Sequence, residues 1–174
     1  DTEYNPWTKE LHRYSVAWRY NIDDMPVVRV VEAGEVYRWA HPPEHIIMQN
    51  AEADWPYITS TFGALPETWD DTMSAHAVLY GTLRHSLDFM GSLYARHNRG
   101  KQLQHSDPLV YSGMDALSTY DIWQQLSREL ARDPQSHALY KHELKPLLPH
   151  VMARPPVKLN AMHILGLKIP QEEC

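Results

Sequence analysis

The most regular hydrophobic spacing in the chain lies between residues 71 and 100. Apolar and aromatic side chains recur there at alternating steps of three and four residues, which is the spacing of one face of an α-helix. Asp70 or Asp71 can cap the first turn, and Gly100 can end the last one. The pattern predicts one long helix with a packing face formed by Met73, His76, Tyr80, Leu83, Leu87, Met90, Tyr94 and His97.

Two further segments have helical spacing. Residues 114–133 carry apolar side chains on one broad face and stop at Asp133 and Pro134. A shorter helix is expected from Ser136 to about Leu144, because Pro146 and Pro149 follow it and proline disrupts a helix interior. Together with the first helix, these segments predict an antiparallel three-helix core over about 71–150.

The first third of the chain is less regular. Residues 27–39 are rich in valine on both sides of a Glu-Ala-Gly turn, which predicts a β-hairpin. The tail after residue 154 is a candidate for a third strand. A short helix is expected from about Pro43 to Ala53, and residues 55–71 read as an ordered, aromatic, proline-rich loop.

The N-terminal residues 1–24 predict a separate aromatic arm or helix. Trp7, Leu11, Tyr14 and Trp18 follow one another at steps of four, three and four, as on one helical face. The remaining residues, 25–174, are expected to form a single globular domain. The predicted fold class is therefore α+β and mainly α, with the hairpin and long ordered loops packed on the helical core.

Composition narrows the class of protein. No apolar run reaches the roughly 18 residues that a membrane-spanning helix needs, so no membrane span is expected. The single cysteine, Cys174, excludes an internal disulfide framework and favours an intracellular location. The chain has 6 Trp and 10 Tyr but only 2 Phe, and such amphipathic rings are typical of protein interfaces.

One local cluster has the residue types of a metal site. His41, Glu44 and His45 lie within five residues, and zinc accepts imidazole and carboxylate ligands. His85 and Asp88 are three residues apart on the predicted long helix, where they could form an acid/base pair. These residues predict, as an alternative function, a small metal-assisted hydrolase.

Two other functions follow from charge. Residues 71–174 hold 8 of the 11 histidines, which suggests a pH-responsive binding module as a second alternative. The basic stretch at residues 96–101 predicts at most a minor RNA contact in a chain of net charge −6. There is no glycine-rich loop of the kind that cradles phosphates.

The leading prediction is a non-enzymatic structural or interaction subunit of a larger assembly, such as an organellar complex or a protein shell. It follows from the aromatic content and from the lack of a recognised catalytic motif. The expected partners are other protein subunits or further copies of the chain, and no cofactor is expected. The side chains predicted to contact partners are Trp7, Trp18, Trp55, Trp69, Arg96, Arg99 and Lys101.

Overall fold

The structure, a computed structural model, describes residues 2–4, 11–19, 25–32, 45–62, 68–97 and 100–152. In this part of the chain the fold is mixed α/β and mainly helical, with one small antiparallel three-stranded sheet. The prediction of a mainly helical fold is therefore confirmed, whereas the predicted three-helix core and aromatic loops are not. None of the described helices is long and apolar enough to cross a bilayer.

The antiparallel sheet has the strand order β1-β2-β3 and consists of β1 (Thr2–Tyr4), β2 (Leu11–Trp18) and β3 (Val27–Glu32). The helix expected over residues 1–24 is wrong for residues 11–18, which form the central strand. Strand β2 buries Tyr14 and Ser15 on opposite faces, because a central strand can be covered on both sides.

The hairpin predicted over residues 27–39 is confirmed in its first strand, β3, and its second strand lies outside the described residues. Strand β3 pairs with β2 in antiparallel register, Arg13 opposite Glu32 and Trp18 opposite Val27. Residues 33–44 and the C-terminal tail, the candidate third strand, lie outside the described residues.

Next comes a β-α-β unit: β4 (His45–Met48), α1 (Ala51–Phe62) and β5 (Thr68–Asp71), the two strands being parallel. The helix predicted over 43–53 and the loop predicted over 55–71 are both wrong. The run of Ile46, Ile47 and Met48 is too short for a helix but suits a buried parallel strand, and such strands need a crossover, here α1.

The long helix predicted over 71–100 is two helices, α2 (Thr72–Leu79) and α3 (Leu87–Tyr94). Asp71 caps α2 as expected, accepting hydrogen bonds from the backbone N–H groups of Met73 and Ser74. The hydroxyl of Ser86 caps a new start by accepting from Phe89 N, so the chain turns back between the two helices.

The C-terminal half is helical: α4 (Leu103–Ser106), α5 (Pro108–Arg132), α6 (Pro134–Ala138), the π-helix η1 (Leu139–Leu144) and α7 (Lys145–Met152). Helix α5 confirms the pattern over 114–133 and begins six residues earlier. The helix expected to end near Leu144 instead continues, because Pro146 falls in the first turn of α7, where a missing N–H costs no hydrogen bond.

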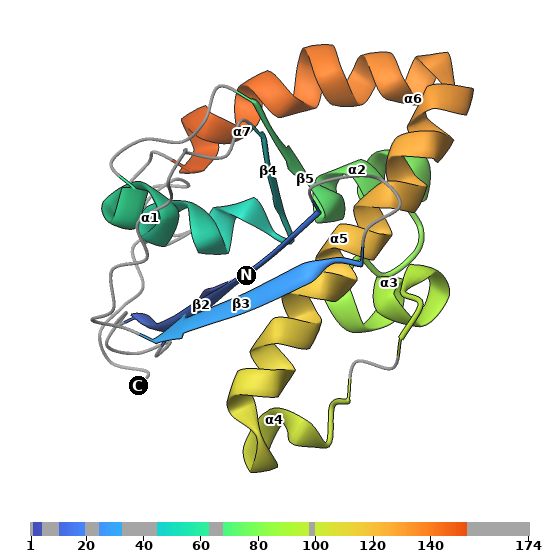
Figure 1. The fold of residues 1–174 in the computed structure, drawn as a ribbon. Helices are drawn as coiled ribbons and strands as arrows, with labels where there is room; N and C mark the ends of the chain where they lie inside the picture. The colour runs from blue at the N-terminus through green and yellow to red at the C-terminus, as the bar shows by residue number, and fades with distance from the viewer. Residues whose placement is uncertain are drawn as a thin grey trace, which may run out of the picture.

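Helix α5 organises the described part of the molecule. It packs against β2 and β3 on one side and against α2 and α3 on the other, while the segment from α6 to α7 passes over the β4-β5 pair (Figure 1). At Gly113 a side chain would meet Val28 and Val30 of β3 at 3.1 and 3.3 Å, so glycine permits this close approach. The main core beyond the sheet consists of Ala75, Met90, Ile122, Leu126, Leu130 and Tyr140.

Candidate functional site

Two of the buried carboxylates have structural roles. Asp71 accepts hydrogen bonds from the backbone N–H groups of Asn50 and Ala51 and also caps α2, so it joins the beginnings of two helices. Burial raises the pKa of Asp71 although these donors act against it. Asp121 of α5 accepts from Arg96 N and lies 3.5 Å from His97 Nδ1, which attaches the end of α3 to α5.

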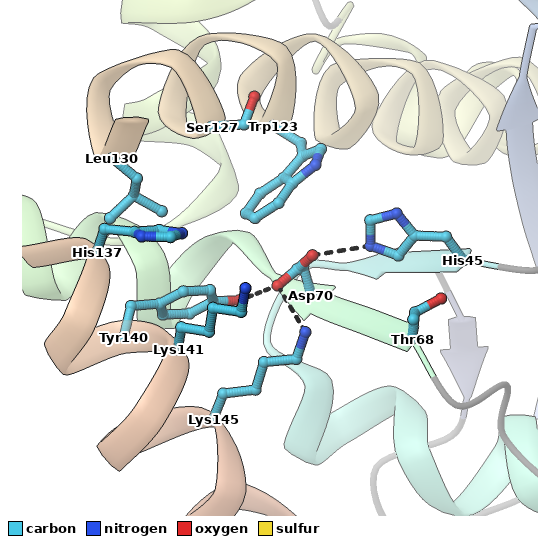
Figure 2. A pocket seen from close by; sticks show the side chains of 10 residues that line it. All are labelled: His45, Thr68, Asp70, Trp123, Ser127, Leu130, His137, Tyr140, Lys141 and Lys145. Atoms are coloured by element: carbon cyan, nitrogen blue, oxygen red, sulfur yellow. Dashed lines mark hydrogen bonds and ion pairs between the residues drawn. The ribbon is translucent and has the colours of Figure 1, made fainter. Parts of the chain in front are cut away.

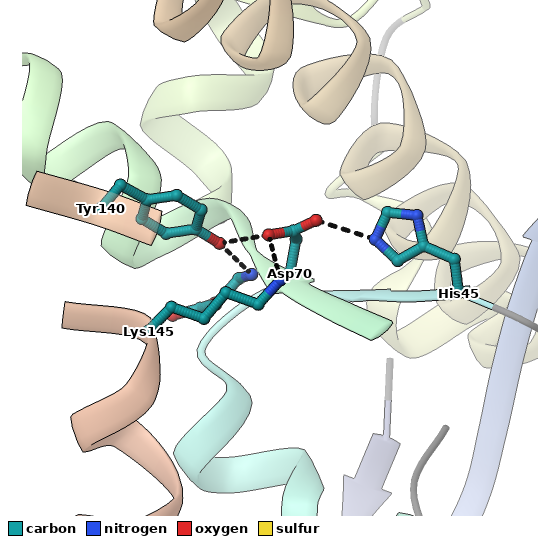
Figure 3. A network of polar contacts seen from close by, with 5 residues as sticks. His45, Asp70, Tyr140 and Lys145 are labelled. Atoms are coloured by element: carbon teal, nitrogen blue, oxygen red, sulfur yellow. Dashed lines mark hydrogen bonds and ion pairs between the residues drawn. The ribbon is translucent and has the colours of Figure 1, made fainter. Parts of the chain in front are cut away.

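A third buried carboxylate, Asp70, lies at the edge of a pocket of about 340 Å³ between β4, β5, α5 and the α6-η1-α7 segment (Figure 2). Its Oδ2 is 2.8 Å from His45 Nε2. Its Oδ1 accepts from Tyr140 Oη at 2.9 Å and from Lys145 Nζ at 3.1 Å, as Figure 3 shows. The phenol of Tyr140 in turn accepts from Asp71 N.

This network changes the protonation of two members. Burial alone would raise the pKa of Asp70, but hydrogen bonds from His45 and Tyr140 and the charge of Lys145 outweigh it and lower the pKa. Burial and the neighbouring charge of Asp70 raise the pKa of the Tyr140 phenol. Asp70 is therefore an ionised group with each oxygen already engaged.

Glu3 and Asp54 differ from these residues because each keeps an oxygen without a partner. Asp54 Oδ1 accepts from Thr2 N at 3.1 Å and from Thr2 Oγ1 at 2.5 Å. Asp54 Oδ2 and Glu3 Oε1 are buried and find no hydrogen-bond partner among the described residues. Buried carboxylate oxygens normally have one, and a bound ion is one reason for their lacking it.

Asp115 is a further buried carboxylate and lies on α5, the helix that packs against β2. Ser112, one turn earlier, exchanges hydrogen bonds with Ser15 of β2, and Asp115 lies on the same stripe of α5. Arg13 shares a face of β2 with Ser15, and its Nε lies 3.6 Å from Glu3 Oε2. The Glu3 side chain therefore lies on the face of the sheet that α5 covers.

The side chains of Glu3, Asp54 and Asp115 have the donor atoms that a divalent cation binds. Magnesium prefers oxygen ligands and is often held by one or two carboxylates together with substrate phosphates. Among the residues that the structure describes, no group of three or more acidic, histidine or cysteine side chains is placed to hold a metal ion. The unpartnered oxygens of Glu3 and Asp54 are two donor atoms that a bound ion would satisfy.

The predicted metal cluster is described only at His45. Its imidazole faces Asp70, and the side chain is 41% exposed. His41 and Glu44 lie outside the described residues, so that metal site stays a prediction.

The predicted pair of His85 and Asp88 does not form. His85 Nδ1 lies 2.7 Å from Nδ1 of the buried His76, and Asp88 accepts from Lys101 at 2.8 Å. Both contacts arise from the turn between α2 and α3, which brings His85 back over α2.

The residues predicted to contact partners are scattered. Trp69 is 6% exposed and packs edge-on against Trp55 at 5.3 Å between ring centroids. Lys101 is in its ion pair with Asp88, Arg96 is exposed, and Trp18 is half-buried in β2. Trp7 and Arg99 are not among the described residues, and a role for any of these side chains in partner binding stays a prediction.

The sequence analysis missed Glu3, Asp54 and Asp115. One signal was available: Asp115 falls on a helical stripe with Ser112, Ala116 and Thr119, so an acidic residue holds a core position. Nothing comparable marks Glu3 or Asp54, since their neighbours come from distant parts of the chain.

Comparison with known proteins gives one result. A family model described as 3'-5' exonuclease, from DNA polymerase A, matches residues 37–131, just over half of the chain. No curated protein and no solved structure matches. The family match contradicts the predicted non-enzymatic structural subunit. That prediction was wrong because it took the lack of a recognised catalytic motif as evidence against an enzyme, whereas the family match extends over residues in which no such motif was recognised.

Proposed function

The chain belongs to the 3'-5' exonuclease family of DNA polymerase A, and on this basis we propose that it hydrolyses the terminal phosphodiester bond at the 3' end of a DNA strand. We assign the activity to particular residues because Glu3 and Asp54 each have a buried carboxylate oxygen without a hydrogen-bond partner among the described residues. Asp54 and Asp115 lie inside the matched residues, and Glu3 lies before them.

The chemistry of phosphodiester hydrolysis accounts for such oxygens. Nucleases characteristically use divalent cations, which when bound polarise the phosphate and lower the pKa of the attacking water. Glu3, Asp54 and Asp115 are the side chains that would hold such cations here. Their contribution is negative charge on side chains that the fold holds in place.

Thr2 orients this site. Two hydrogen bonds from Thr2 occupy Oδ1 of Asp54 and leave Oδ2 as the oxygen available to a cation. A carboxylate whose orientation is fixed by hydrogen bonds from neighbouring residues is a better ligand, because it is already oriented when the cation binds. The hydrogen bonds also join α1 to β1, so the fold and the site depend on the same contact.

The test is the substitution Asp54→Asn. An asparagine carbonyl can still accept both hydrogen bonds from Thr2, so the fold is expected to persist while the negative charge is lost. We expect release of nucleotides from a 3'-labelled single-stranded oligonucleotide, in the presence of Mg²⁺, to fall by roughly 100-fold or more.

The matched control is Glu52→Gln, which removes one exposed negative charge from the same helix. It is expected to leave the rate unchanged. Wild-type rates from Asp54→Asn, or degradation that continues in EDTA, would contradict the proposal.

A further inference from the structure

The pocket beside Asp70 is separate from the carboxylates assigned to hydrolysis. None of Glu3, Asp54 and Asp115 lines it, although Trp123, Ser127 and Leu130 belong to α5 as Asp115 does. The residues that line it are His45, Thr68, Asp70, Trp123, Ser127, Leu130, His137, Tyr140, Lys141 and Lys145 (Figure 2).

The lining is basic in a chain of net charge −6. Of the ten described residues that form it, two are lysines, two are histidines and one, Asp70, is a carboxylate. Lys145 and Tyr140 engage Oδ1 of Asp70, and His45 engages Oδ2. Lys141 is exposed at the pocket and adds a second cation to that of Lys145. The pocket therefore has more positive charge than Asp70 balances, and this favours an anionic ligand.

The opposite wall is aromatic. The indole of Trp123 projects from α5 into the space between His45 and His137 (Figure 2). Its ring centroid is 6.3 Å from the rings of both His45 and Tyr140. Leu130 adds an apolar surface beside it. An aromatic face of this kind binds flat rings by stacking.

Two residues with hydroxyl side chains also line the pocket. They are Ser127, whose hydroxyl donates to Gln124 O of the same helix at 3.4 Å, and Thr68 of β5. The volume, about 340 Å³, is at the small end of the range for ligand pockets. A simple anion would use the lysines and leave the indole without a partner, whereas a flat ring joined to a phosphate would use both walls.

We propose that this pocket is a second nucleotide site, which binds one nucleoside monophosphate with its base against Trp123 and its phosphate near Lys141 and Lys145. The ligand is either a free nucleotide or a single unit of a DNA strand, and the chemistry recognised is the same. The proposal rests on the lining residues and does not depend on the hydrolytic activity.

The experiment is isothermal titration calorimetry of the full chain with dAMP, with inorganic phosphate and with a short single-stranded oligonucleotide. EDTA is present throughout, so that a cation-dependent site at Glu3 and Asp54 does not contribute. Two variants are compared with the wild type, Lys141→Gln and Trp123→Leu. The matched control is Lys101→Gln, which removes the same charge from a lysine that pairs with Asp88.

We expect Lys141→Gln to weaken dAMP binding about tenfold, the value of one charge-assisted hydrogen bond, and Lys101→Gln to leave it unchanged. Trp123→Leu is expected to weaken dAMP and leave any binding of phosphate as it was. Because Trp123 also packs on the main core, its thermal unfolding is recorded, and Lys141→Gln decides the result if Trp123→Leu does not fold.

Binding of dAMP identifies a free nucleotide as a sufficient ligand. If the oligonucleotide binds and dAMP does not, and Lys141→Gln weakens the binding, the ligand is a nucleotide unit within a DNA strand. The proposal is overturned if neither ligand binds, if both bind Lys141→Gln as tightly as the wild type, or if phosphate binds as tightly as dAMP. Asp54→Asn is expected to keep dAMP binding in EDTA, so a failure of the proposed nuclease function is distinguishable from a failure here.

Discussion

Aspartates of this chain have different roles because their surroundings differ. Asp71 uses both oxygens to cap and join helices, and Asp70 uses both in a network with a tyrosine, a lysine and a histidine. Asp54 alone of these three has one oxygen held and the other unpartnered among the described residues. A side chain that is both oriented and incomplete is suited to binding a ligand, which is why Asp54 is the residue chosen to test hydrolysis.

At the same scale, the buried His76 predicts a dependence of stability on pH. Burial, and then the charge of His85, lower the pKa of His76 below its ordinary value of 6.5. As the pH falls below about 6.5, the unfolded chain takes up a proton at this position that the folded chain does not, so the free energy of unfolding decreases. For one such group the decrease approaches about 1.4 kcal/mol per pH unit.

Urea denaturation at pH 7.5 and pH 5.5 measures this effect. The variant His76→Gln is expected to lose less stability than the wild type between the two values, since it has no imidazole to protonate. His105→Gln, at an exposed histidine of α4, is the comparison and should behave as the wild type. Equal losses in His76→Gln and wild type would show that His76 is not the source.

At the scale of elements, the turn between α2 and α3 divides the predicted long helix into two shorter helices. Ser86 caps α3, and Tyr80 at the end of α2 donates to Glu129 of α5. Both helices can then pack against α5, and His85 returns to His76. A continuous helix would extend past α5 and lose these contacts.

Gly100, which precedes α4, has a left-handed backbone conformation. Gly100 has φ +61°, and a Cβ there would lie 2.9 Å from Leu103 Cδ1. Non-glycine residues adopt this region with strain. We expect Gly100→Ala to lower the free energy of unfolding by about 1–2 kcal/mol, measured by urea denaturation.

Gly81→Ala is the control for this prediction. Gly81 is exposed, and the nearest atom to an added Cβ is Ala77 O at 3.4 Å, an ordinary contact. Its stability should stay within about 0.5 kcal/mol of the wild type. Similar losses in both variants would mean that the conformation of Gly100 is not the cause.

At the scale of the whole molecule, the candidate hydrolytic site is assembled from three separate segments. Glu3 belongs to β1, Asp54 to α1 and Asp115 to α5. A cation that binds across these elements binds the folded chain and not the unfolded one, and therefore stabilises the fold. This connects ligand binding to global stability.

We accordingly expect Mg²⁺ to raise the melting temperature of the wild type by a few degrees, measured by calorimetry against EDTA. Asp54→Asn should lose most of this increase, and Glu52→Gln should retain it. A Mg²⁺ effect of equal size in Asp54→Asn would place the binding cation elsewhere.

The sequence alone determined the features that depend on near neighbours. The spacing over 114–133 located α5, and the valine-rich run located β3. The helix cap was narrowed to Asp70 or Asp71, and Asp71 is the cap in the structure. These succeed because helix faces, β-branched strands and caps are set by residues within a few positions of each other.

Only the tertiary structure decided the partners of those elements and the candidate sites. The spacing at residues 11–18 fits a helix face, but in the fold this segment pairs with β1 on one side and β3 on the other and is a strand. The spacing over 71–100 fits one helix, but in the fold it forms two helices that both pack against α5. Glu3, Asp54 and Asp115 are up to 112 positions apart in the chain. Which of these segments come near one another is decided by burial across the whole fold and not by local spacing.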